Sequence, residues 1–180
     1  MPSLRGKLLI AAPTLLDPNF SRTVVLICQH GDEGALGLVL NRRTELEVEA
    51  AVPELHELMD GDDHLWSGGP VQPSSIVLLA EFDDPEEALM VTGDVGLVLE
   101  GTDMEALGDT TRRARAFVGY SGWGAGQLEA EVEADDWIVA PTDPEDAFTD
   151  EPADLWRRAL ERKGGRYALL ATMPTNPSLN

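Results

Sequence analysis

The sequence predicts an α+β fold, in which residues 1–180 form a single compact domain with a mixed, hairpin-rich β-sheet flanked by several short helices. Three observations lead to this prediction. The chain has 180 residues and is 43% hydrophobic, which is enough for one core of ordinary domain size. Short apolar runs recur along it with turn residues between them, and segments with helical spacing separate some of these runs. A barrel-like closure is one form that such a sheet can take.

The N-terminal part of the chain is predicted to contain three strands, at residues 7–12, 22–30 and 35–42, because these runs are largely apolar, and the second is also rich in β-branched residues. The segment GDEG between the second and third runs predicts a hairpin. Residues 47–58 have helical spacing, but Pro53 should kink this helix or limit it to a short second half. A loop follows at residues 61–75.

The middle of the chain continues with a buried strand at residues 76–82. Apolar runs on both sides of Gly93-Asp94, the second of them spanning residues 95–100, predict another hairpin. Thr102 and Glu105 match a capping box, which predicts a helix that is short or is interrupted at Gly108.

The last third alternates between strands and helices. Strands are predicted at 115–123 and 137–141, a helix at 126–134, and a helical turn at 144–146. Residues 152–165 form the clearest amphipathic helix, with Gly164 as its natural end. A closing strand is predicted at 166–172, so hairpins and helical crossovers together make the sheet mixed.

The chain is strongly acidic, with 33 Asp and Glu against 13 Lys and Arg and a formal net charge of −20. Such a surface repels phosphate backbones and anionic membranes, which argues against direct nucleic-acid or membrane binding. No segment reaches the roughly 18 continuous apolar residues that a membrane span needs. Pro13 breaks the apolar N-terminal stretch, so we expect a cytoplasmic protein that keeps this segment.

The stretch GYSGWGAGQLEAE, residues 119–131, invites a chemical interpretation. A nucleophile elbow has the pattern G-x-S-x-G, but Trp123 stands at the second glycine position and all histidines precede Ser121. The dinucleotide pattern G-x-G-x-x-G begins with Gly122 and Gly124 but lacks its last glycine. Gly122, Gly124 and Gly126 are therefore predicted to let the strand turn into the next helix, whose first N–H groups could hold a small anion.

The single cysteine supplies the one candidate for a reactive pair. Cys28 lies in the apolar run TVVLICQH, where a free cysteine usually behaves as a small core residue. His30 stands two positions later, and in a regular strand it would share a face with Cys28, so a thiol–imidazole pair is the alternative interpretation.

A metal site is not predicted, and neither is a cofactor. His56 and His64 flank Asp60, Asp62 and Asp63, a set that could hold a divalent cation, but a solvated acidic loop explains the same residues.

Five blocks resemble, in order and spacing, the YqgE/AlgH family of bacterial proteins: DPNFSRTVVLICQH, GALGLVLNR, GGPVQP, GYSGWGAGQLEAE and WIVAP. The resemblance runs from about Gly6 to the last predicted strand. It implies a compact α+β fold without an established enzymatic activity, and one branch name derives from a proposed regulatory role in alginate production. The family tends to have a small residue such as alanine at the position of Ser121, which further weakens a nucleophile there.

The favoured hypothesis is a non-enzymatic cytoplasmic domain that binds a small molecule or a protein partner, and any transcriptional role would then be indirect. The alternative is a small enzyme that uses Cys28 and His30. The family blocks are expected to gather around one cleft, although each residue has a structural explanation as well. The candidate ligand-binding residues are Asn19, Arg22, Thr23, Asn41, Gly68, Gly69, Pro70, Tyr120, Gly122, Trp123 and Gln127.

Overall fold

The computed structural model describes residues 1–59, 63–83, 88–98 and 102–174. Its strands are β1 (Leu8–Ala11), β2 (Val24–Gly31), β3 (Gly34–Val39), β4 (Arg43–Glu47), β5 (His64–Ser67), β6 (Val71–Phe82), β7 (Ala88–Thr92), β8 (Val95–Val98), β9 (Thr111–Gly124) and β10 (Trp137–Ala140). The helices are α1 (Val48–Ala51), the 3₁₀ helix η1 (Pro53–Leu58), α2 (Met104–Thr110), α3 (Gln127–Glu133), α4 (Pro144–Ala147), α5 (Pro152–Lys163) and α6 (Arg166–Leu170).

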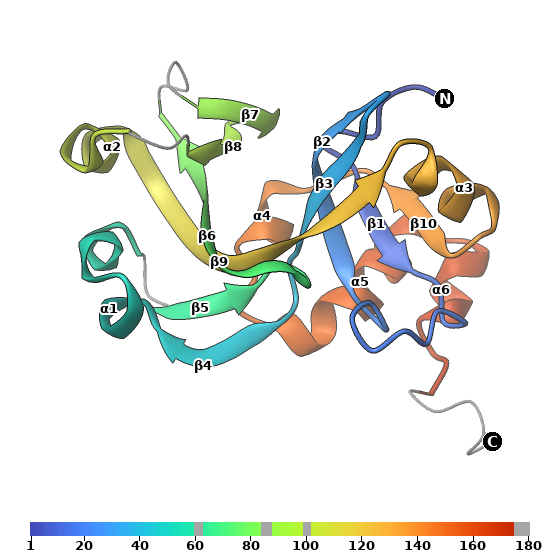
Figure 1. The fold of residues 1–180 in the computed structure, drawn as a ribbon. Helices are drawn as coiled ribbons and strands as arrows, with labels where there is room; N and C mark the ends of the chain where they lie inside the picture. Colours follow the sequence, from blue (N-terminus) through green and yellow to red (C-terminus); the bar gives the residue numbers. More distant parts are fainter. Residues whose placement is uncertain (60–62, 84–87, 99–101, 175–180) are drawn as a thin grey trace.

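The strands form one open ten-stranded sheet in the order β10-β1-β2-β3-β9-β6-β8-β7, with β4 and β5 joined to it beside β9 (Figure 1). All pairs are antiparallel except that of β5 with β9. The α+β class and the mixed, hairpin-rich sheet are therefore confirmed, whereas the barrel-like closure is wrong. β9 is 14 residues long and links the two parts of the sheet, because its last residues pair with β3 and its first residues pair with β6.

The part of the sheet made by β1, β2, β3 and β10, here called the closed half, is covered on both faces. On one face Ile10 and Leu26 pack with Leu155 and Trp156 of α5. On the other, a second apolar cluster includes Leu128 of α3. This double burial explains why these strands are almost continuously apolar in sequence.

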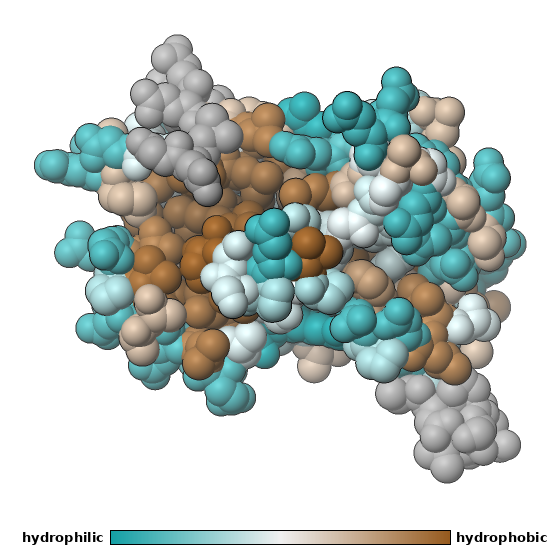
Figure 2. All heavy atoms as spheres, viewed as in Figure 1, coloured by the Kyte–Doolittle hydropathy of each residue, from teal (hydrophilic) through white to brown (hydrophobic). Residues whose placement is uncertain are grey.

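The part made by β5, β6, β7, β8 and the first residues of β9, here called the open half, is covered differently. Leu79 and Phe117 face the main core. Leu78 and Ala116 face the opposite way, toward η1 and α2, in a third cluster. Figure 2 shows that part of this second face lies open, as a hollowed apolar surface between α1 and α2.

The main local predictions are confirmed. The hairpins β2–β3 and β7–β8 form, although residues 99 and 100 of the second predicted strand lie outside the described residues. Pro53 separates α1 from η1, as its fixed φ and missing N–H require. The helix after Thr102 begins one residue later than predicted, because the Asp103 carboxylate accepts a hydrogen bond from the Glu105 N–H at 3.0 Å.

Two regions differ from the predictions. Residues 166–170 form α6 and not a closing strand: Gly164 and Gly165, with φ of 77° and 58°, reverse the chain so that α6 packs against α5. A run as short as RYALLAT does not distinguish strand from helix by periodicity. The predicted loop contains β5 and the start of β6, because Trp66 and Ser67 pair in parallel with Phe117 and Val118, a long-range pairing that local sequence does not show.

Candidate functional site

The glycine-rich block around Ser121 has a structural explanation. Ser121 is fully buried, and its Oγ donates a hydrogen bond to the Gly68 carbonyl at 3.1 Å. Gly119 has φ of 71°, and a Cβ there would lie 2.4 Å from the Gly69 carbonyl oxygen. A Cβ on Gly69 would lie 2.3 Å from the Tyr120 carbonyl oxygen, so the GGP and GYSGWG blocks meet through backbone contact that only glycine permits.

The turn into α3 lies at one glycine and not at three. Gly126 has φ of 73° and caps α3, whereas Gly122 and Gly124 lie within β9. Gln127 accepts a hydrogen bond at its Oε1 from the Gly124 N–H at 3.0 Å, which fixes the corner. The prediction of a structural turn is thus confirmed at Gly126, while Gly122 has ordinary space, since a Cβ there would lie 3.5 Å from its nearest neighbouring atom.

Trp123 lines a different cavity from Arg22 and Asn41. It packs with Phe20 and Trp137, with ring centroids 6.3 and 6.2 Å away. Its cavity has a volume of about 590 Å³ and is also lined by Arg5 and His30. The expectation that all family blocks surround one cleft is therefore not met for this residue.

Cys28 and His30 do not form a pair. The register of β2 against β3 shifts between Ile27 and Gln29, and such a bulge reverses the side-chain alternation. Cys28 is fully buried in the core that faces α5, and burial raises the pKa of its thiol to about 12. His30 turns the other way: its Nδ1 accepts from the Leu4 N–H at 2.8 Å, and its Nε2 lies 2.7 Å from a Glu129 carboxylate oxygen on α3.

Three of the predicted residues meet at the start of β2. Asn41 accepts at its Oδ1 from the Val24 N–H at 3.0 Å and donates from its Nδ2 to the Arg22 carbonyl at 2.9 Å. The buried Thr23 donates to the Phe20 carbonyl at 2.7 Å. These bonds hold Arg22 at φ of 56°, a conformation that is uncommon for a residue with a side chain.

The Arg22 side chain leaves this loop toward α5. Its guanidinium carbon lies 4.3 Å from the ring centre of Trp156, and it donates to the Met173 carbonyl at 2.5 Å. Both partners are neutral. Within the described part of the chain, Arg22 has no ion pair with a carboxylate, although the chain carries 33 of them.

Arg42, which the sequence analysis did not select, lies beside Arg22. Its guanidinium donates to the carbonyls of Asn19 at 2.7 Å, Pro18 at 2.9 Å and Ser21 at 3.2 Å. Burial lowers the pKa of Arg42, and the charge of Asp17 only partly opposes this effect. It likewise has no ion pair among the described residues, so a second guanidinium is partly desolvated without a counter-charge in contact.

A cavity of about 380 Å³ opens beside these two arginines. Its lining includes Arg22, Asn41 and Arg42 on one side and Pro152, Asp154 and Arg157 from the start of α5 on the other. Of its three arginines, Arg157 is paired with Asp154 at 2.6 Å and with Glu161 at 2.7 Å, so Arg22 and Arg42 are the two without a carboxylate in contact among the described residues. Glu151 is the N-cap residue of α5, but its side chain accepts no capping hydrogen bond. The helix N-terminus therefore adds a partial positive charge at the cavity.

The predicted site is thus divided among separate places. Arg22 and Asn41 line the cavity, here called the arginine pocket, and Thr23 and the backbone of Asn19 support it. Gly68, Gly69 and Tyr120 form the backbone contact beside β9, and Pro70 follows it. Arg42 and Arg157 were missed; Arg42 directly follows Asn41 in a block that was singled out, whereas only the folded chain brings Arg157 close.

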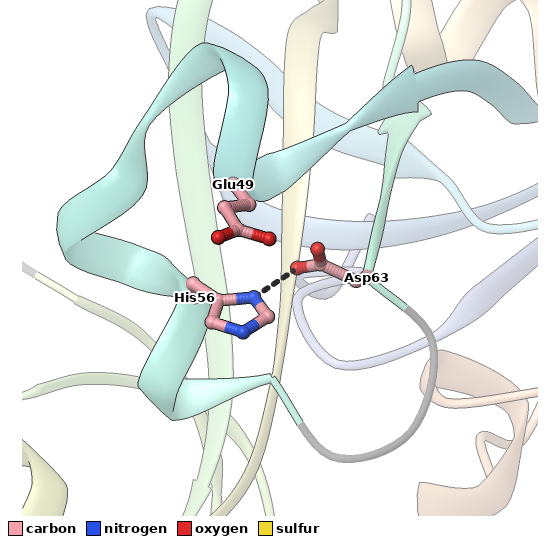
Figure 3. Close-up of side chains that lie close together, drawn as sticks. All are labelled: Glu49, His56 and Asp63. Atoms are coloured by element: carbon pink, nitrogen blue, oxygen red, sulfur yellow. Dashed lines mark ion pairs between the residues drawn. The ribbon is translucent and has the colours of Figure 1, made fainter.

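A second group of polar side chains lies on the wall of the open half. His56 Nδ1 lies 3.0 Å from a carboxylate oxygen of Asp63, and Glu49 completes a group whose ligand-type atoms all lie within 4.8 Å of one another (Figure 3). The Asp63 contact, first by hydrogen bonding and then by charge, raises the pKa of His56. An imidazolium–carboxylate ion pair accounts for this group; Asp60 and Asp62 lie outside the described residues, and His64 is not part of it.

A family model and individual relatives identify the same protein family for this chain. The model of the AlgH-like family matches residues 8–168. A UPF0301 protein of Thermobifida fusca is 39% identical over 190 residues, covering 99% of this chain and 96% of that protein. One from Streptomyces coelicolor is 40% identical over 185 residues, covering 99% and 96%.

Two solved structures share the fold. A crystal structure of a Corynebacterium diphtheriae protein has a TM-score of 0.88 at 27% identity, covering 96% of this chain and 93% of that one. The solution structure of the AlgH protein from Pseudomonas aeruginosa has a TM-score of 0.72 at 28% identity, covering 97% of each. Within the described residues of this chain, no helix is long and apolar enough to cross a bilayer.

Proposed function

The chain belongs to the AlgH-like family, and we propose that it acts by binding a small anionic molecule in the arginine pocket. The observation that carries this proposal is the pair Arg22 and Arg42: two partly buried guanidinium groups face one cavity and have no carboxylate partner among the described residues. In a chain of net charge −20, acidic partners are abundant, so their absence here leaves this position available to an external anion.

The chemistry of the lining favours an oxyanion. A guanidinium group presents N–H donors in a plane that matches two oxygens of a carboxylate or phosphate. Arg22 uses one of its nitrogens for the Met173 carbonyl, so donors remain, and Asn41 and the start of α5 lie on the same cavity. A volume of about 380 Å³ is at the lower end for ligand sites, which suits a small molecule.

Binding without bond-breaking is supported by the state of the two side chains that could act as nucleophiles. Cys28 is fully buried with a pKa raised to about 12, so it is a neutral thiol out of reach of a substrate. Ser121 is fully buried and donates to the Gly68 carbonyl. A regulatory role, which the family resemblance implies, would then act through the bound ligand and not through contact with nucleic acid.

The test is isothermal titration calorimetry of the full chain with inorganic phosphate, a phosphate monoester and a dicarboxylate in separate titrations. We expect at least one of these anions to bind. Arg22→Met, which keeps an apolar contact with Trp156 but removes the charge, should weaken that binding by roughly tenfold or more.

Arg166→Met is the matched control, because Arg166 also lies over an aromatic ring, that of Tyr167 at 5.0 Å, but outside the arginine pocket. It should leave the affinity unchanged. The proposal fails if none of the anions binds, if Arg22→Met binds as the unaltered chain does, or if Arg166→Met causes the larger loss.

A further inference from the structure

The apolar face of the open half forms a groove whose floor contains the partly exposed side chains of Ile76 and Val118. Farther along β6 and β9, Leu78 lies opposite Ala116 and Ala80 lies opposite Ala114, and these four side chains are 7% exposed or less. Ile76, opposite Val118 on the same face, is 37% exposed. Figure 2 shows this brown surface hollowed between α1 and α2, so apolar area remains in contact with solvent on a chain of high charge.

Methionine side chains surround this groove. Met59, Met90 and Met104 pack at the edge of its apolar cluster and are only partly buried, and they are three of the five methionines in the chain. Methionine is unbranched and flexible, and it adapts to the shapes of different partners, so it is typical of surfaces that receive apolar side chains of another molecule.

Both walls of the groove are acidic. Residues 44–59, which include α1 and η1, contain five Glu and no Lys or Arg. Residues 102–110, which include α2, contain three acidic residues, also without Lys or Arg. The floor is apolar and the walls carry only negative charge apart from His56.

We propose that this groove, at the surface of β6 and β9 between η1 and α2, binds a basic amphipathic helix of a partner protein. Apolar side chains along one helix face would contact the floor and the methionines, and Lys or Arg on its flanks would lie beside the acidic walls. Charge complementarity selects a basic partner and repels an acidic one. This surface is separate from the arginine pocket and of the opposite charge, so the two proposals stand or fall independently.

A second copy of this chain does not fit the groove. Face-to-face association would bring the acidic walls of both copies together, and each copy carries a net charge of −20. Like charges brought together in this way cost several kcal/mol. The occupant is therefore a basic segment of a different protein.

The experiment measures fluorescence anisotropy of a labelled synthetic peptide of about 18 residues, with Leu at helical spacing i, i+3, i+4, i+7 and Lys elsewhere. A twin peptide with Glu in place of every Lys is the first control. We expect saturable binding of the Lys peptide, weakened by added salt, and no binding of the Glu twin.

The variant Ile76→Asp distinguishes binding of the peptide in the groove from non-specific electrostatic attraction to the acidic surface. It adds a negative charge, so a peptide held only by electrostatics would bind more tightly, whereas a peptide seated on the apolar floor should bind roughly tenfold or more weakly. Leu169→Asp is the matched control, because Leu169 is 71% exposed on α6, outside the groove, and it should not weaken binding.

Three results would overturn the proposal. The Glu twin could bind as well as the Lys peptide, or Ile76→Asp could bind the Lys peptide as tightly as the unaltered chain. Sedimentation could also show a self-dimer that Ile76→Asp dissociates, which would make a second copy the occupant.

Discussion

The closed and open halves of the sheet differ in how far they bury apolar side chains. Leu26 on β2 is fully buried, with helices on both faces of its strand. Ile76 on β6 pairs with Val118 of β9 but remains 37% exposed. Figure 2 shows that an apolar surface of the open half faces solvent. The difference separates two uses of apolar sequence: burial that stabilises the fold, and exposure that is available for binding.

The same division holds for charge. The arginine pocket collects guanidinium groups beside the closed half, and the groove of the open half has acidic walls. The net charge of −20 therefore agrees with the acidic walls of the groove but does not describe the arginine pocket. The following predictions test the contrast, from the largest expected effect to the smallest.

Thiol labelling should differ most between the halves. Cys28 should react with a thiol reagent only through unfolding, which for an ordinary domain slows the reaction by roughly 10⁴-fold or more. A cysteine placed at the exposed position, Ile76→Cys in a Cys28→Ala background, should react at nearly the rate of a free thiol. Mass spectrometry of labelled protein over time gives both rates; fast labelling of native Cys28 would revive the thiol–imidazole hypothesis.

Truncation of an apolar side chain should cost much more in the closed half. Leu26→Ala leaves a cavity in a fully buried cluster and should lower the free energy of unfolding by about 2–5 kcal/mol. Ile76→Ala removes atoms that are partly in water, and we expect a cost of about 1 kcal/mol or less. Urea denaturation measures both, and equal losses would contradict the distinction between the halves.

The junction between the halves depends on one glycine of β9. Gly119→Ala would combine a positive φ of 71° with a Cβ only 2.4 Å from the Gly69 carbonyl oxygen, so we expect a loss of about 1–3 kcal/mol. Gly122→Ala lies in the same strand with ordinary space, and it should change the stability by roughly 0.5 kcal/mol or less. If the two variants unfold at the same urea concentration, the backbone contact does not explain the glycines of this block.

The smallest effect is a pH dependence in the open half. The pKa of His56 is raised by its hydrogen bond to Asp63 and by the nearby carboxylates, so the folded state favours the imidazolium form. This contribution is complete below the ordinary pKa of about 6.5 and is lost as pH rises through the higher folded value. His56→Gln should remove this dependence, as followed by denaturation midpoints between pH 5 and pH 9; an unchanged profile would count against the ion pair.

The sequence predicted much of the closed half, because its information is local there. Apolar runs such as TVVLICQH and the turn GDEG set β2 and β3 without reference to distant residues. The reversal of Cys28 and His30 was missed, since one extra residue in a strand leaves no mark in an apolar pattern.

The open half and the sites were harder to predict, because they arise from long-range contacts. β5 pairs with β9 across some 50 positions, and Ile76 of the groove lies opposite Val118 of β9. Arg22 and Asn41 were identified from a family block, but the partner surface on α5 comes from 110 or more positions later in the chain. Sequence spacing carries no record of such juxtapositions.

One NMR titration tests the central claim, that two surfaces of opposite charge bind different partners independently. Backbone amide signals of the full chain are followed while the best-binding anion and then the Lys peptide are added to the same sample. The account predicts that the anion shifts signals around Arg22, Asn41 and Ala153, and that the peptide then shifts those of Ile76, Leu78 and Val118 without reversing the first set. Peptide-induced displacement of the anion, or both ligands shifting the same signals, would contradict it.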